Sequence, residues 1–109
     1  MGSDKITHFS NKADHDAFVA ANNYLTVIDF HATWCGPCLQ IAPIYDKLAE
    51  EHEDVKFTKV DVDAAPDVAQ HYQISAMPTF VFLKDGKEVD RLRGANPPAL
   101  TAAIAKNKA

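Results

Sequence analysis

Apolar and polar residues follow one another along this chain with two periods, one typical of strands and one typical of helices. Residues 25–32 (LTVIDFHA) are β-branched and apolar on both faces, which favours a central strand covered by helices. Residues 55–63 (VKFTKVDVD) alternate with a period of two, as a second strand does. The helix expected over residues 11–20 has an apolar stripe formed by Ala13, Ala17, Phe18 and the following Ala21. We therefore expect two strands and one helix in these three segments.

Turn and capping residues set the expected boundaries of several elements. Ser10 precedes the helical stripe of residues 11–20 and is expected to cap that helix. Asp85-Gly86 joins two strand-like runs, and Asp-Gly is a strong hairpin signal. Asn96 is expected to cap the last helix, which begins with a proline pair.

The order of these elements predicts the fold class. Parallel crossovers are expected between the early strands, whereas the final hairpin must be antiparallel. The sequence therefore predicts an α/β sandwich with a mixed sheet. In chain order, the expected elements are strand 5–9, helix 11–20, strand 25–32, helix 35–51, strand 55–63, helix 66–71, strands 79–83 and 88–94, and a helix from residue 97.

Length and composition limit the classes of function. The 109 residues, 47% apolar and 24% charged, are typical of one soluble domain spanning residues 1–109. A net charge of −4 disfavours nucleic acid or an anionic membrane as a partner. The start MGSDKITHF lacks the apolar core of a signal peptide, and residues 1–3 are expected to be disordered or left over from cloning. We therefore expect a cytoplasmic protein.

Both cysteines lie in residues 34–38, WCGPC. A disulfide that closes so short a loop stabilises a fold by only about 2 kcal/mol, against roughly 4.7 kcal/mol for a loop of about a hundred residues. A reducing compartment also disfavours purely structural disulfides. The spacing therefore points to reactive cysteines.

The expected position of the two cysteines suggests how they react. Cys35 falls at the start of a helix, where unpaired N–H groups and the helix dipole stabilise a thiolate. Cys38 follows one turn later on the same helix face, and Pro37 suits a first turn. Cys35 is therefore expected to be the exposed nucleophile that attacks a substrate disulfide, and Cys38, one turn further inward, is expected to be the resolving thiol.

Three further motifs accompany WCGPC: VIDF before it, MPTF at residues 77–80 and GAN at residues 94–96. In this order and spacing they resemble the thioredoxin family over nearly the whole chain. The resemblance implies a five-stranded mixed sheet with four helices and a monomer that reduces protein disulfides. It also implies that no cofactor is bound, because electrons come from NADPH through a separate thioredoxin reductase.

The resemblance assigns roles to further residues. Asp29 matches the family's buried acid, and its carboxylate interrupts an apolar strand, so it is the expected proton acceptor for Cys38 unless its tip reaches solvent. Lys59 matches the lysine near that acid, although a solvated strand lysine would fit equally well. Pro78 matches the cis-proline that faces the cysteines. The expected substrate rim consists of Trp34, Gly36, Pro37, Val62, Ala76, Met77, Gly94 and Ala95, with core packing as the alternative for Val62 and Ala95.

One residue near the cysteines departs from the family pattern, and another occupies a position for which the family has no fixed residue. Leu39 follows Cys38 where the family commonly has a basic residue, so one local positive charge is missing. His31 occupies a variable position and is interpreted as a partly exposed bystander.

Three other classes of function share some of these sequence features. A zinc module needs two more ligands than one Cys-x-x-Cys supplies, and the histidines show no paired spacing. An oxidase or isomerase of the same fold is disfavoured by Gly36-Pro37, which offers no cation to stabilise the thiolate. A non-catalytic role as subunit or binding partner in the reduced form is compatible with every residue.

Overall fold

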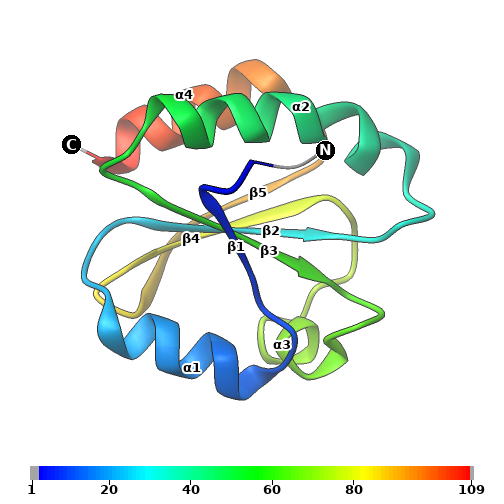
Figure 1. The fold of residues 1–109 in the computed structure, drawn as a ribbon. Coiled ribbons are helices and arrows are strands. Elements are labelled where there is room, and N and C mark those ends of the chain that lie inside the picture. Colours follow the sequence, from blue (N-terminus) through cyan, green and yellow to red (C-terminus); the bar gives the residue numbers. More distant parts are fainter. Residues whose placement is uncertain (1–2, 109) are drawn as a thin grey trace.

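The computed structural model describes residues 3–108, and within them the chain forms one mixed five-stranded sheet and four helices. The strands lie side by side in the order β1-β3-β2-β4-β5 (Figure 1). The predicted α/β sandwich is confirmed. The elements are β1 (Ile6–His8), α1 (Lys12–Ala21), β2 (Thr26–His31), α2 (Gly36–Glu51), β3 (Lys56–Asp61), α3 (Pro66–His71), β4 (Thr79–Lys84), β5 (Lys87–Arg93) and α4 (Pro97–Lys108).

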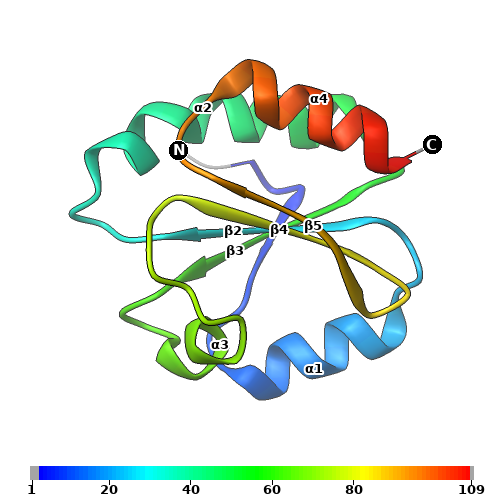
Figure 2. The ribbon, with the colours of Figure 1, turned by 180° about the vertical axis from the view of Figure 1, so that it is seen from behind.

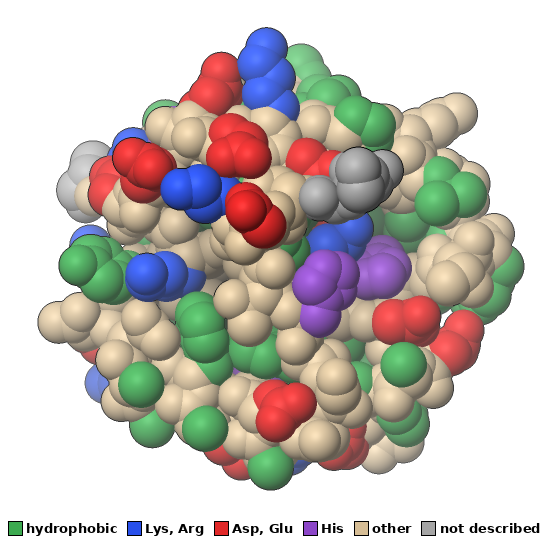
Figure 3. Space-filling model, viewed as in Figure 1, with side chains coloured by type: hydrophobic (Ala, Val, Ile, Leu, Met, Phe, Trp, Pro, Cys, Tyr) green, Lys and Arg blue, Asp and Glu red, His purple; other side chains and the backbone are tan. Residues whose placement is uncertain are grey.

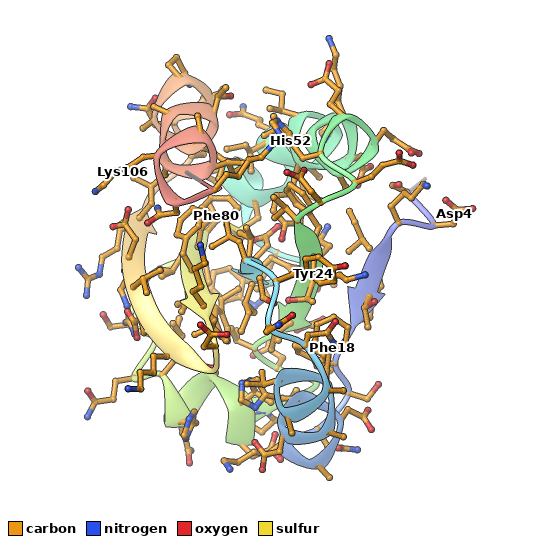
Figure 4. All side chains as sticks on the ribbon, turned by 90° about the vertical axis from the view of Figure 1, so that its left-hand side faces the viewer. Asp4, Phe18, Tyr24, His52, Phe80 and Lys106 are labelled. Atoms are coloured by element: carbon orange, nitrogen blue, oxygen red, sulfur yellow. A yellow bond between two sulfur atoms is a disulfide. The ribbon has the colours of Figure 1, made fainter. Side chains whose placement is uncertain are left out.

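Two helical layers enclose the sheet. Helices α2 and α4 cover one face, and α1 and α3 cover the other, as the two opposite views show (Figures 1 and 2). Phe80 of β4 lies on the side of α2 and α4, while Phe18 of α1 lies on the other side (Figure 4). Strand β2 at the centre is buried along Thr26 to Phe30, as a strand covered on both faces must be.

The strand directions agree with the sequence prediction. Strand β3 pairs in parallel with both β1 and β2, and β4 pairs antiparallel with β2 and β5. The β4–β5 hairpin turns at Asp85 and Gly86, whose φ angles of 52° and 78° are the positive values that a type I′ turn requires. The predicted hairpin is therefore confirmed.

One predicted helix cap is wrong by one residue. Asn11, not Ser10, caps α1, because its side-chain oxygen accepts the N–H of Asp14 at 2.8 Å. Asp14 in turn accepts the N–H of Ser10 at 3.3 Å, so the serine is held as a backbone donor. At the other end of the chain Asn96 accepts the N–H of Ala99 at 3.1 Å, as expected of the cap of α4.

The N-terminal expectation falls partly outside the described residues, because Met1 and Gly2 lie there. Ser3 is described, and its hydroxyl donates a hydrogen bond of 3.0 Å to Glu50 of α2. None of the helices within residues 3–108 combines the length and the apolar character that crossing a membrane requires.

Candidate active site

The two cysteines meet where β2 runs into α2, and they form a disulfide with a Cα–Cα distance of 5.3 Å. Cys35 is the N-cap of α2 in an extended conformation, and its sulfur accepts the N–H of Cys38 at 3.2 Å. A sulfur in this position receives one of the free N–H groups of the first turn and faces the positive end of the helix dipole. Both effects favour a thiolate at Cys35 once the disulfide is reduced.

The expected difference in exposure between the two cysteines is absent from the disulfide form. Cys35 is only 6% exposed and Cys38 5% exposed, and both pack with Ala32, Val62 and Met77. The sequence interpretation of an exposed Cys35 is therefore wrong for this state. The reason is the neighbouring loop, whose Met77 carbonyl oxygen lies 3.7 Å from the Cys35 sulfur.

That loop carries the cis peptide bond between Met77 and Pro78, where the resemblance implied one. Gly94 donates its N–H to the Pro78 carbonyl at 2.9 Å, which brings the end of β5 beside the loop. Gly94 has a φ of 95°, a conformation that favours glycine. Ala76 is exposed, and its carbonyl accepts the Thr79 hydroxyl at 2.6 Å.

The remaining rim residues differ in their surroundings. Trp34 is 67% exposed, and its indole N–H donates to Asp63 at 2.8 Å, so it is a surface residue held in one orientation. Gly36 and Pro37 are exposed in the first turn of α2. Val62 and Ala95 are half-buried: each packs against core residues and keeps part of its surface exposed.

Asp29 is a buried carboxyl group beside the helix that carries the cysteines. It is 1% exposed, and its Oδ1 has no hydrogen-bond partner within residues 3–108. Burial raises the pKa of Asp29 to about 7, the positive charge of Lys59 opposes this rise, and the negative charge of Asp46 adds to it. An acid with this pKa can accept and release a proton near neutral pH.

Lys59 lies next to Asp29 in the sheet, since the two residues are directly paired between β3 and β2. Because residues paired in this way point to the same face, the lysine is the cation nearest to the buried acid along the strand pair. The solvated-lysine alternative is only partly right: Lys59 is half-buried and acts electrostatically on Asp29.

Two residues near the site were missed by the sequence analysis. Asp46 of α2 acts on Asp29, and its spacing of eight residues, about two turns, from Cys38 was a usable signal. Asp63, which anchors Trp34, gave no signal, because the contact joins two loops that are 29 residues apart.

The described part of the chain contains no group of three or more histidine, cysteine or acidic side chains that could hold a metal ion. The site therefore offers two sulfur atoms, a buried acid and an apolar rim. This is an arrangement for dithiol–disulfide exchange.

Comparison with known proteins gives a consistent result. The thioredoxin family model matches residues 6–106. Thioredoxin-2 of Saccharomyces cerevisiae is 49% identical over 102 residues, which are 94% of this chain and 98% of the yeast protein. The mitochondrial thioredoxin-3 of the same yeast is 46% identical over 99 residues, which are 91% of this chain and 77% of that protein.

Solved structures agree in fold as well as in sequence. The thioredoxin of Fasciola hepatica superposes with a TM-score of 0.90 at 46% identity, covering 92% of this chain and 97% of that one. The thioredoxin of Nicotiana alata gives a TM-score of 0.91 at 39% identity, covering 97% and 94%. With its Cys35–Cys38 disulfide at the start of α2, the chain belongs to the thioredoxin family, whose members are thiol–disulfide oxidoreductases that reduce protein disulfides.

Proposed function

We propose that Cys35 is the attacking nucleophile and Cys38 the resolving thiol of this disulfide reductase. The Cys35 thiolate attacks a sulfur of the substrate disulfide, forms a mixed disulfide and releases one substrate thiolate. Cys38 then attacks the Cys35 sulfur, which closes the Cys35–Cys38 bond and releases the second substrate thiolate. The observation that carries this order is the N-cap position of Cys35, whose sulfur accepts the Cys38 N–H.

Asp29 and Lys59 serve the second step in this proposal. Cys38 must lose its proton before it can attack, and a buried carboxylate with a pKa of about 7 is a suitable acceptor. Lys59, paired with Asp29 across the strands, stabilises the ionised form of that acid.

The proposed substrate surface surrounds the buried sulfur atoms. Trp34 is its large exposed apolar residue, and large aromatic side chains often dominate binding interfaces. The half-buried Met77 lies directly on the cysteine pair. The full proposed set is Trp34, Gly36, Pro37, Val62, Ala76, Met77, Pro78, Gly94 and Ala95.

Family membership supports a separate thioredoxin reductase as the electron donor, with NADPH as the primary source. The proposed working form is a monomer without a bound cofactor, because each step above uses residues of one chain. The proposed compartment is the cytosol, since both cysteines serve one reactive pair and neither is used as a structural staple.

A coupled assay tests this function. In the presence of NADPH, a thioredoxin reductase and a protein disulfide, the chain is expected to sustain NADPH oxidation, measured by absorbance. A variant with serine at both positions 35 and 38 is the matched control and is expected to give only the background rate. Equal rates with the chain and with this control would refute the proposed function.

The direction of the reaction is tested at Pro37. Pro37→His is expected to raise the reduction potential by some tens of millivolts, because an imidazole beside Cys35 stabilises the thiolate of the reduced form. Each 30 mV corresponds to about 1.4 kcal/mol for a two-electron couple. Equilibration against a glutathione buffer measures the potential, and Pro37→Ala controls for the loss of the proline ring. An unchanged potential in Pro37→His would remove the argument against an oxidase.

A further inference from the structure

His31 is an imidazole beside the buried acid that the exchange steps above do not use. It ends β2 two residues after Asp29, so the two side chains project from the same face of the sheet. This is the face covered by α2, because Val27, two residues before Asp29, packs with Ile41 and Tyr45 of that helix.

His31 is partly exposed, as expected from the sequence, yet one of its ring nitrogens is enclosed by the protein. The residue is half-buried, and its Nε2 is a buried atom with no hydrogen bond to any residue between 3 and 108. Asp29 Oδ1 is likewise a buried atom without a hydrogen-bond partner among residues 3–108. Buried polar atoms nearly always have a partner, so these two on one face of the sheet call for an explanation, as does Asp46 Oδ1, a third such atom on the helix α2. Residues two apart in a strand are separated by about 6.6 Å along the strand axis, so the two side chains are neighbours on this face.

Charged groups from the neighbouring strands bear on this imidazole. Burial lowers the pKa of His31, the positive charge of Lys59 on β3 lowers it further, Asp61 on β3 opposes this, and the nearby His8 of β1 adds to the lowering. The ring is therefore largely neutral at pH 7 and can both accept and donate a proton. From α2, Asp46 acts on Asp29. Figure 3 shows histidine side chains gathered on the surface near the ends of β2 and β3.

We propose that His31 is a positioning residue that passes protons between Asp29 and solvent, an inference that rests on the proposed role of Asp29 as the acceptor for Cys38. Asp29 needs such a path because its carboxyl group is 1% exposed. His31 is half-buried, with a buried Nε2 and an exposed remainder, and it takes no part in the reaction of the sulfur atoms.

Cys38 gives its thiol proton to the Asp29 carboxylate while its sulfur attacks the Cys35 sulfur. The bond between Cys35 and the substrate breaks, and the substrate leaves as a thiolate with the electron pair. Asp29 then releases the proton through His31 to solvent, where the substrate thiolate takes one up. The substrate disulfide is reduced by two electrons, and the protein dithiol is oxidised.

The test separates the two steps of the exchange. His31→Gln keeps a polar side chain but cannot relay protons in this pH range. Single-turnover reduction of a peptide disulfide is expected to be roughly tenfold slower at pH 7 than in the parent protein, part of the 10²–10⁴-fold that proton transfer contributes. In a Cys38→Ser background, the mixed disulfide is expected to form at the same rate with histidine or glutamine at position 31.

Two further measurements exclude a merely structural effect. The solvent deuterium isotope effect on the second step is expected to increase in His31→Gln, and free imidazole is expected to restore part of the rate in His31→Ala. His71→Gln, which removes an exposed imidazole from α3 on the opposite face of the sheet, is the matched control and is expected to keep the parent rate.

The outcomes distinguish this inference from the proposed function. If the parent protein reduces the peptide and Asp29→Ala slows it, an unchanged rate and pH profile in His31→Gln would overturn the role of His31 alone. Equal slowing of both steps would also overturn it. A parent protein with no reductase activity would instead refute the proposed function.

Discussion

Asp29→Ala is expected to make the oxidised protein more stable at pH 7, by about 3 kcal/mol. The folded pKa of Asp29 is about 7, against about 3.9 in an unfolded chain. Three units correspond to about 4 kcal/mol, from which roughly 1 kcal/mol is lost through the small cavity that alanine leaves. The same change is expected to slow disulfide reduction without abolishing it, because the proton acceptor is lost.

The sign of this effect follows from proton linkage. Between about pH 4 and pH 7 the native state binds more protons at Asp29 than the unfolded state does, so stability falls as pH rises through this window. The gain from Asp29→Ala is therefore expected to shrink toward pH 4, where the native carboxyl is neutral. Denaturant titrations at several pH values measure it.

Asp29→Asn is the matched variant, since it keeps the size of the side chain and removes the charge. It is expected to lose the same pH dependence and to gain less stability, because its amide would also be buried without a partner. A less stable Asp29→Ala variant at pH 7 would mean that the carboxylate is stabilising as it stands, and the proton-relay interpretation would fail.

Cys35→Ser is expected to reduce disulfide reductase activity to the uncatalysed background. A serine hydroxyl at the start of α2 stays protonated at neutral pH, so no attacking anion forms. The remaining Cys38 is buried one turn further along the helix, so its sulfur does not occupy the N-cap position that Cys35 holds. Turnover in the coupled assay measures the loss, and circular dichroism checks that the fold is retained. Substantial residual turnover would make Cys38 the nucleophile.

The sequence was sufficient for the fold because its local signals agree with one another. The apolar run before the cysteines predicts a doubly covered strand, and β2 is that strand. Asp85-Gly86 predicts the tight hairpin that is observed. The misassigned cap arose because Ser10 and Asn11 are adjacent and both suitable, and the choice depends on which side chain reaches the N–H of Asp14.

The sequence was sufficient to identify the residues of the site, but it gave less information about the packing around them. Asp29 could be identified as unusual from its position in an apolar strand alone. The burial of Cys35 could not be predicted from the sequence, because Met77 covers this residue from a loop 42 residues away. The buried, unpartnered state of His31 Nε2 could not be predicted either, because it depends on how side chains pack at the end of β2. The periodicity of apolar residues carries no information about a single ring nitrogen.

The most direct test of the central claim, that Cys35 attacks and Cys38 resolves, is the intact mass of a Cys38→Ser variant after reaction with a peptide disulfide. The first step can occur in this variant and the second cannot, so a stable mixed disulfide should accumulate. The account predicts one added peptide per chain, located at Cys35 by proteolysis and tandem mass spectrometry. No adduct at Cys35, or continued turnover by the variant, would contradict it.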